Sequence, residues 1–117
     1  MTSIFLEDSF DAAHRLPHVP PDHKCARLHG HTYRIRIEVT GPVGEQTGWI
    51  MDYAKLRTVW REVKYYLDHR DLNVHFANPT CEIIAIWIAE KLKELKIAGL
   101  SRIELRETEH CGVVYVP

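Results

Sequence analysis

The stretch HGHTYRIRIEV, residues 29–39, decides the fold of this chain. Apolar and polar residues alternate along it, which is the period of a β-strand with one buried face and one exposed face. The polar face carries Thr32, Arg34, Arg36 and Glu38. The apolar face carries Tyr33, Ile35, Ile37 and Val39. His29 and His31 continue this apolar face, so the stretch predicts a strand whose buried side begins with two imidazoles.

The preceding residues predict the partner of this strand. IFLEDSFDAAH, residues 4–14, alternates in the same way, with an exception at Asp8 and with His14 at the end of its apolar side. Residues 15–28 contain three prolines, which exclude regular structure and leave a loop that returns the chain for antiparallel pairing. In such a hairpin the end of the first strand neighbours the start of the second. We therefore expect His14 beside the two histidines of the next strand.

Two helices are predicted after the hairpin. Residues 48–52, GWIMD, are expected to form a short strand that leads into the first helix, with Asp52 as its N-cap. Asn78-Pro79-Thr80 indicates the start of the second helix, and Gly99 indicates its end. Each helix has an apolar stripe at helical spacing, formed by Leu56, Val59, Trp60, Val63 and Leu67 in the first and by Ile83, Ile84, Trp87, Ile88, Leu92 and Leu95 in the second.

Two strands are expected to complete the sheet. SRIELRE, residues 101–107, alternates, and CGVVYV, residues 111–116, follows it after a short connection. The element order ββααββ predicts an α+β fold in which two helices cover one face of an antiparallel four-stranded sheet. Because 117 residues suffice for a single core and no repeat or linker interrupts them, we expect one domain over residues 1–117.

The composition narrows the class of protein. The chain is 45% hydrophobic and 26% charged, which is typical of a globular protein. The formal charge is −1, so the chain lacks the excess of basic residues that is typical of a nucleic-acid binder. No apolar run is long enough for a membrane helix and the N-terminus does not resemble a signal peptide, so we expect a cytoplasmic protein without a membrane partner. Three cysteines at unrelated spacings argue against a disulfide framework and leave room for a functional thiol.

Three imidazoles on one face of a hairpin predict a metal site. Neutral imidazoles bind Zn²⁺ well, and three protein ligands leave a fourth position for water or substrate, which is the usual catalytic arrangement. Gly30 allows the backbone to pass close to the ion, because it has no Cβ. Satisfied core histidines are the alternative. For three in this register we favour a zinc site formed by His14, His29 and His31.

Cys25 lies in the loop, four residues before His29. Two roles are open for it: a fourth ligand that closes a structural metal site, or a thiolate near the metal that acts as base or nucleophile. Its neighbours Lys24 and Arg27 are cationic, and cationic surroundings favour the thiolate. We therefore predict a reactive thiol.

Two carboxylates are further candidates for chemistry. Asp68 directly precedes His69 just past the first helix, where it can support the imidazole as a proton carrier, although such pairs also serve as helix caps. Glu107 is in register with Ile103 and Leu105, so its carboxylate is desolvated unless it meets donors. A ligand with adjacent N–H groups would supply them. The alternative is that the strand has already left the core at Glu107.

These residues carry a resemblance that spans nearly the whole chain. The stretches are FDAAHRLPHVP, HKCARLHGHTY, TGWIMDY, LDHRDLN, NPTCE and the ET of RETEHCG. The sequence resembles the 6-pyruvoyl-tetrahydropterin synthase superfamily, whose tunnelling fold is a ββααββ unit. The spacing Cys25-x-x-x-His29 is similar to that of its carboxy-forming members, which act in queuosine biosynthesis. Cys81, where serine is common, and the run from Glu109 to Cys111 depart from the family pattern.

The resemblance implies a reaction and a role for each candidate. The substrate would be 7,8-dihydroneopterin triphosphate, converted to 6-carboxy-5,6,7,8-tetrahydropterin with release of triphosphate and acetaldehyde. The three histidines would bind zinc, Cys25 would be the catalytic base, and Asp68 and His69 would assist proton transfer. Glu107 would anchor the pterin ring and join the proton relay. The remaining substrate contacts are assigned to Thr80, Arg15, Lys24 and Arg27, of which the three basic residues would attract the triphosphate or remain solvated surface charges.

Two other functions stay open. One is pyruvoyl formation or a related pterin lyase reaction, and the other is a non-enzymatic zinc module that Cys25 closes. The resemblance also implies trimeric rings that stack as hexamers, with active sites where subunits meet. Because the edges of a long four-stranded sheet are otherwise unprotected, we expect a homo-oligomer, and the resemblance implies that it is a homohexamer of two trimers.

Overall fold

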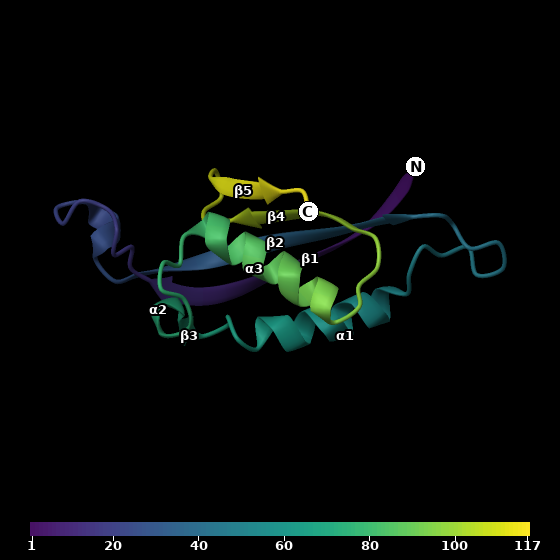
Figure 1. The fold of residues 1–117 in the computed structure, drawn as a ribbon, viewed down its shortest axis with the longest axis horizontal. Coiled ribbons are helices and arrows are strands. Elements are labelled where there is room, and N and C mark those ends of the chain that lie inside the picture. The colour runs from purple at the N-terminus through teal and green to yellow at the C-terminus, as the bar shows by residue number, and fades with distance from the viewer.

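The computed structural model describes residues 1–117 and shows a five-stranded sheet with helices on one face (Figure 1). The predicted α+β class is confirmed. The strands are β1 (Thr2–His14), β2 (His29–Gly41), β3 (Arg70–Asp71), β4 (Leu100–Arg106) and β5 (Gly112–Tyr115). The helices are α1 (Tyr53–Lys64), α2 (Leu72–His75) and α3 (Cys81–Glu94), and a 3-10 turn, η1, covers Lys24–Ala26. No helix is both long and apolar enough to span a bilayer.

The strand order is β3-β1-β2-β4-β5, and every neighbouring pair is antiparallel except β1 and β3. The β1–β2 hairpin dominates the sheet, with pairing that runs from Thr2 opposite Gly41 to His14 opposite His29. This is the predicted pairing. The loop after β1 and the loop after β2 project from opposite ends, so the molecule measures 58 × 23 × 21 Å (Figure 1).

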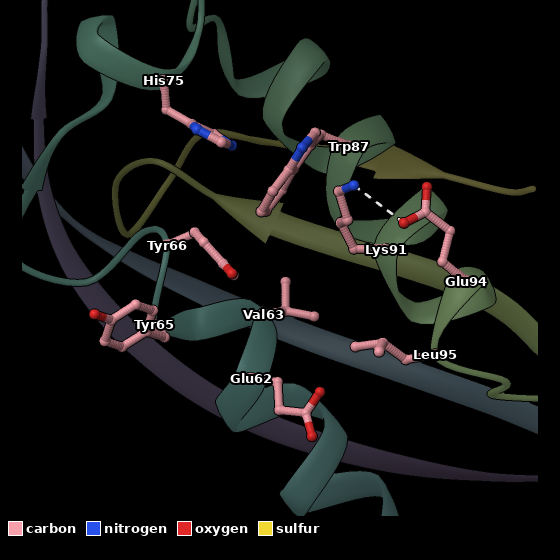
Figure 2. Close-up of a pocket in the computed structure, with 9 residues that line it drawn as sticks. All are labelled: Glu62, Val63, Tyr65, Tyr66, His75, Trp87, Lys91, Glu94 and Leu95. Atoms are coloured by element: carbon pink, nitrogen blue, oxygen red, sulfur yellow. Dashed lines mark hydrogen bonds and ion pairs between the residues drawn. The ribbon is translucent and has the colours of Figure 1, made fainter.

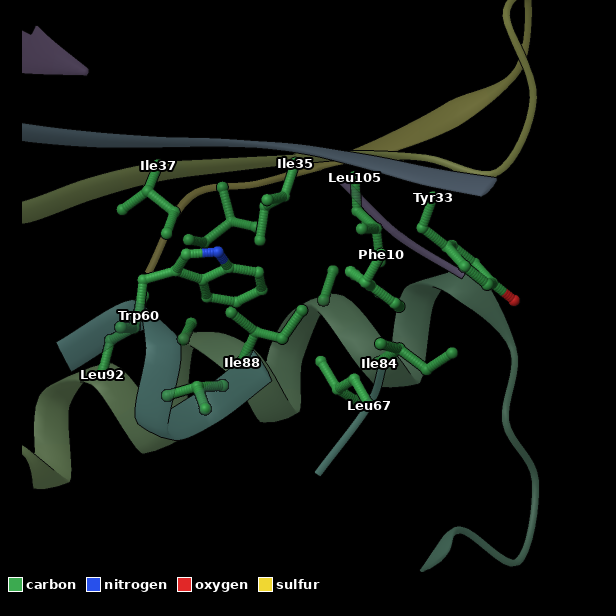
Figure 3. Close-up of a cluster of buried hydrophobic side chains, with 14 of the residues drawn as sticks. Phe10, Tyr33, Ile35, Ile37, Trp60, Leu67, Ile84, Ile88, Leu92 and Leu105 are labelled. Atoms are coloured by element: carbon green, nitrogen blue, oxygen red, sulfur yellow. The ribbon is translucent and has the colours of Figure 1, made fainter. Parts of the chain in front are cut away.

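The core lies between the sheet and helices α1 and α3 (Figure 3). Trp60 of α1 and Ile88 of α3 are buried against Phe10 and Ile37 of the sheet. Burial of each such side chain contributes about 1.5–3 kcal/mol of stability. Asp8, the exception in the alternation of β1, accepts hydrogen bonds from Trp60 Nε1 at 2.8 Å and from Lys64 Nζ at 3.1 Å. Burial raises the pKa of Asp8, but these donors outweigh burial and leave the pKa below its usual value.

The predicted N-cap of the first helix and the predicted start of the second are present, but the predicted end of the second helix at Gly99 is wrong, because α3 ends at Glu94 with Leu95 as its C-cap. Asp52 accepts from the backbone N–H of Ala54 at 2.8 Å, and Thr80 Oγ1 accepts from the N–H of Ile83 at 3.2 Å. Gly99 follows α3 with a φ of +79°, and a Cβ at this position would lie 2.5 Å from the carbonyl oxygen of Thr40. The glycine is therefore required both by the backbone conformation and by the close approach of β2.

Three further sequence predictions need correction. Residues 48–52 do not form a strand; they lie in the projecting loop, where the N–H of Gly44 donates to the Trp49 carbonyl. They pair with no strand of the sheet, although Ile50 and Met51 pack against the core. The sheet has five strands where four were predicted, because β3 pairs in parallel with residues 12–13 of β1. The chain also has three helices where two were predicted. The additional one, α2, is a single turn and is too short to show a periodic pattern.

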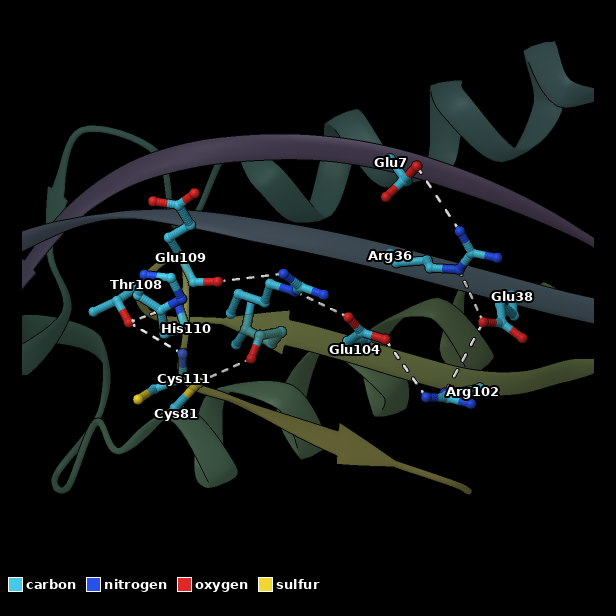
Figure 4. Close-up of polar contacts among 12 residues, drawn as sticks. Glu7, Arg36, Glu38, Cys81, Arg102, Glu104, Thr108, Glu109, His110 and Cys111 are labelled. Carbon is cyan, nitrogen blue, oxygen red and sulfur yellow. Dashed lines mark hydrogen bonds and ion pairs between the residues drawn. The ribbon is translucent and has the colours of Figure 1, made fainter.

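The sheet face that the helices leave uncovered carries a charge ladder, which we define as Glu7, Arg36, Glu38, Arg102, Glu104 and Arg106 (Figure 4). The best-aligned ion pairs are Arg36–Glu38 and Arg106–Glu104, each with an N···O distance of 3.0 Å. Exposed pairs of this kind contribute little stability individually. Their alternating signs keep a broad face polar without a large net charge.

Candidate metal centre

Three imidazoles meet where the β1–β2 hairpin opens toward its loop. The ring centroids of His14 and His29 are 4.6 Å apart, those of His14 and His31 are 5.1 Å apart, and those of His29 and His31 are 4.8 Å apart. His14 is fully buried and the other two are half-buried. The predicted convergence is confirmed, and it follows from the hairpin register.

Backbone carbonyls fix the orientation of two of these rings. His14 Nδ1 donates to the Pro79 carbonyl at 2.7 Å, and His29 Nδ1 donates to the Arg27 carbonyl at 2.7 Å. A carbonyl oxygen only accepts, so each Nδ1 carries a proton, and in the neutral ring each Nε2 keeps the lone pair that a metal needs. Metal-binding histidines are commonly held in this way. The Tyr33 hydroxyl, 3.3 Å from His14 Nδ1, adds a further polar contact.

Glu107 completes the cluster from the turn after β4. Its Oε1 lies 2.9 Å from His31 Nε2 and 3.4 Å from His14 Nε2. The turn is closed by the N–H groups of Glu107 and Thr108, which both donate to the Cys111 carbonyl. The side chain therefore faces the histidines and has not left the buried face. The contact with His14 lowers the pKa of Glu107, although burial acts in the opposite direction.

The cluster favours protonation of His14 and disfavours protonation of His31. Burial would lower the pKa of His14, but the Glu107 carboxylate and the Pro79 carbonyl outweigh burial and raise it. Burial lowers the pKa of His31, and the neighbouring imidazoles reinforce this effect against the attraction of Glu107. One cation beside the carboxylate is favoured, and additional protons on the same cluster are disfavoured.

The donor set fits a zinc ion. One ligand atom each from His14, His29, His31 and Glu107 lies within 4.8 Å of the others. The Nε2 atoms of His14 and His31 are buried without a hydrogen bond of acceptable geometry. Buried nitrogen lone pairs without partners are satisfied by metal ligation. The sequence indicated the three histidines but not that Glu107 would lie among them as a fourth donor.

Cys25 lies outside this group of four donors. It is the central residue of η1, its side chain is half-buried, and its carbonyl accepts from the N–H of Leu16 at 2.8 Å. The residue that stands beside the histidines as a fourth donor is Glu107. The arrangement favours the interpretation of Cys25 as a free thiol over that of a fourth ligand.

Asp68 and His69 are fixed by the backbone of β1. Asp68 Oδ1 accepts from the N–H of Asp11 at 3.0 Å, and the N–H of His69 donates to the Asp11 carbonyl at 2.6 Å. His69 has a φ of +58°, a left-handed conformation that is rare outside glycine and frequent at functional sites. Its ring is 3.8 Å from Asp68 Oδ2 and its side chain is 79% exposed. Asp11 was not predicted; a polar residue three positions before His14 was the available signal.

An open hollow of about 530 Å³ brings the two parts of the candidate site to one surface. Asp11, His31, His69 and Arg70 are among its lining residues. Neither Cys25 nor Glu107 lines it. In a single chain, the His69 side chain is therefore exposed to solvent in this hollow.

The remaining predicted substrate contacts differ in whether their side chains already have partners within the chain. Arg15, Lys24 and Arg27 are exposed and form no ion pair within the chain. Thr80 already uses its hydroxyl to cap α3. Cys81 donates to the Leu105 carbonyl, and burial raises its pKa to about 12, so it is a neutral thiol.

A second hollow, slightly larger than the one beside His69, lies elsewhere. It measures about 590 Å³ and lies between α1 and α3 (Figure 2). The rings of Tyr66, His75 and Trp87 contact one another there, and Lys91 pairs with Glu94 at 3.0 Å. None of its lining residues belongs to the histidine cluster. It holds no group of three or more metal-ligating side chains, so the candidate metal site is at the histidines.

Comparison with known proteins shows the family of this chain. The sequence model of 6-pyruvoyl tetrahydropterin synthase matches residues 3–117. The chain belongs to the 6-pyruvoyl tetrahydropterin synthase family. A member of the 6-pyruvoyl tetrahydropterin synthase family from Synechocystis sp., named 6-carboxy-5,6,7,8-tetrahydropterin synthase, is 43% identical over 115 residues, which cover 92% of this chain and 88% of that protein.

Two further members of the family extend the comparison. A dihydroneopterin monophosphate aldolase from Pyrococcus furiosus is 38% identical over 113 residues, with 94% of this chain and 93% of that protein covered. The structure of 6-pyruvoyl tetrahydropterin synthase from Caenorhabditis elegans superposes with a TM-score of 0.89 at 29% identity, covering 99% of this chain and 95% of that one. This likeness confirms the predicted tunnelling fold.

Proposed function

We propose that this chain is a zinc-dependent 6-carboxy-5,6,7,8-tetrahydropterin synthase of queuosine biosynthesis. It would convert 7,8-dihydroneopterin triphosphate and water to 6-carboxy-5,6,7,8-tetrahydropterin, triphosphate and acetaldehyde. The observation that carries the proposal is the cluster of His14, His29 and His31, whose Nε2 atoms are available beside the Glu107 carboxylate. The Synechocystis relative that bears this name, at 43% identity, supports the carboxy-forming reaction.

Each remaining residue has a part in the proposed chemistry. The three histidines would hold the zinc ion, which would supply a Lewis acid for the side-chain hydroxyls of the substrate. Cys25, as a thiolate, accepts a carbon-bound proton, and His69, oriented by Asp68, carries protons to and from the substrate. The contacts of Glu107 with His14 and His31 use Oε1, which leaves Oε2 to accept from the N–H groups of a pterin. Arg15, Lys24 and Arg27 attract the triphosphate.

Product analysis tests the proposed function directly. The zinc-loaded protein is incubated with 7,8-dihydroneopterin triphosphate, and the products are identified by mass spectrometry. We expect 6-carboxytetrahydropterin and acetaldehyde. A 6-pyruvoyl product would establish the pyruvoyl-forming reaction instead, and bound zinc without turnover would support a non-enzymatic module.

Aldol cleavage of dihydroneopterin monophosphate is a second candidate. It is favoured by the Pyrococcus furiosus relative, which bears that name and matches over 94% of this chain. Parallel incubation with the monophosphate separates the two reactions, because the aldolase would release a pterin with a one-carbon side chain from a substrate that has no triphosphate to lose. Turnover of the monophosphate alone would replace the synthase proposal.

We expect Glu107→Gln to weaken pterin binding while leaving zinc bound. The pterin presents adjacent N–H donors that need a carboxylate, whereas the three imidazoles hold the metal. Loss of a charged hydrogen-bond partner costs about 1.5–3 kcal/mol, so affinity should fall roughly tenfold or more. The measurement is calorimetric titration with a pterin, alongside zinc analysis. Glu109→Gln, an exposed change in the same turn, is the matched control, and unaltered pterin affinity in Glu107→Gln would show that the carboxylate does not bind the ring.

We also propose that the chain assembles as a hexamer of two trimers and that a neighbouring chain completes the pterin pocket. The open hollow beside His69 and the unpaired edges of β1 and β5 support this arrangement. Size exclusion with light scattering should give six times the 13.6 kDa mass of one chain. A fully active monomer would contradict the proposal, because one chain would then hold a complete pocket.

A further inference from the structure

The turn that carries Cys25 begins with an imidazole as its cap. His23 precedes η1 in an extended conformation, and its Nδ1 accepts a hydrogen bond from the N–H of Cys25 at 3.0 Å. Asp and Asn usually make this contact, in which a side chain accepts from the backbone two residues later. The His23 nitrogen takes the place of their side-chain oxygen, so the imidazole must be unprotonated at Nδ1.

Further hydrogen bonds close the turn around this contact. The N–H of Ala26 donates to the His23 carbonyl at 3.0 Å, and the N–H of His23 donates to the Pro20 carbonyl at 2.9 Å. The Cys25 carbonyl accepts from Leu16, just beyond β1. Both backbone polar groups of Cys25 are thus bonded, one to the side chain of His23 and the other to the segment that follows the metal-binding strand.

The side-chain contact decides how firmly Cys25 is held. A 3-10 turn of three residues has little stability of its own, and none of its residues is buried in the core. Without His23 Nδ1 the N–H of Cys25 has no acceptor in the protein, and the loop loses its one side-chain cap. The half-buried thiol would then sample several positions.

We propose that His23 is a positioning residue for Cys25. By accepting the Cys25 N–H at Nδ1, the imidazole holds the thiol at the place from which it removes a proton from the substrate. The inference rests on the proposed role of Cys25 as the base. His23 acts through the backbone of Cys25, so its effect depends on a hydrogen-bond acceptor and not on an imidazole as such.

The test compares His23→Ala with His23→Asn in the zinc-loaded protein. Turnover is measured together with alkylation of Cys25 by iodoacetamide, with the exposed Cys111 as the internal reference. In His23→Ala we expect kcat to fall about tenfold or more, with KM changed by less than about twofold and zinc content unchanged. Alkylation of Cys25 should accelerate relative to Cys111, because the thiol becomes more exposed.

In His23→Asn, kcat and the rate of Cys25 alkylation should both return to nearly the wild-type values, because the asparagine oxygen accepts from the N–H of Cys25. His18→Ala is the control, since His18 is exposed in the same loop and makes no hydrogen bond. Unchanged alkylation and turnover in His23→Ala would overturn the inference, as would a His23→Asn variant as impaired as His23→Ala. If Cys25→Ala kept full turnover, the proposed role of Cys25 would fail, while the alkylation contrast would still test the cap.

Discussion

His29→Ala is expected to abolish zinc binding. The wild-type protein should hold about one zinc per chain, and removal of one of three imidazoles leaves too few donors for a stable site. His29 is the best position for this change because it is half-buried, whereas His14 is fully buried and its loss would also disturb the core. Elemental analysis after dialysis and competition with a chromophoric chelator measure the effect.

His110→Ala is the matched control for this experiment, because His110 is an exposed imidazole in the turn that carries Glu107. It should retain the metal. Zinc content that is unchanged in His29→Ala would refute the site formed by the three histidines. Retention of weak binding, with faster release to the chelator, would instead show that Glu107 acts as a ligand in place of the lost imidazole.

Cys25→Ala is expected to retain zinc and to lose turnover. Loss of a positioned base typically reduces rate by about 10²- to 10⁴-fold, and the thiol lies outside the group of four donors around the candidate metal position. The measurements are zinc content and the initial rate of pterin formation on the same preparation. Cys111→Ala, which removes an exposed thiol, should change neither quantity.

The two possible roles of Cys25 give different results in this variant. Simultaneous loss of zinc and activity would support a closed structural site with Cys25 as the fourth ligand. Retention of both would remove Cys25 from the mechanism and leave Glu107 and His69 as the candidate bases. The two variants together therefore separate metal binding from proton transfer.

The hairpin and its histidines could be predicted because a strand has a period of two. Once residues 29–39 and 4–14 are assigned to paired strands, the alternation places His14, His29 and His31 on one face. The helix cap Asp52 was equally clear, because its chemistry is local. These predictions needed no knowledge of contacts between distant segments.

Other features depend on contacts that periodicity does not encode. The exception at Asp8 is explained by Trp60 and Lys64, which lie more than fifty residues away in the chain. The hydrogen bonds between Asp11 and the Asp68-His69 pair arise from a two-residue strand that has no pattern of its own. Residues 48–52 have a strand-like composition, but they pair with no strand of the sheet. The prediction of a strand from their composition was therefore wrong.

The position of Glu107 shows the same limit. Register with Ile103 and Leu105 indicated the face of the sheet correctly. The conformation of the turn from 107 to 111, closed by the Cys111 carbonyl, decides that the carboxylate reaches His31 and His14. A turn of this length has several accessible conformations, and the sequence alone does not select one.

The separation of the thiol from the histidines has a consequence for how this fold diversifies. The three imidazoles lie on two strands whose register is fixed by thirteen residue pairs, whereas Cys25 lies on the loop that joins those strands. Insertion or deletion between Cys25 and His29 would move the base relative to the substrate without changing the register of the ligands, and surface loops tolerate such changes at small cost. In the proposed site, the metal-binding half would thus stay constant while the position of the proton-accepting thiol varies, which would let related chains act on different bonds of one substrate.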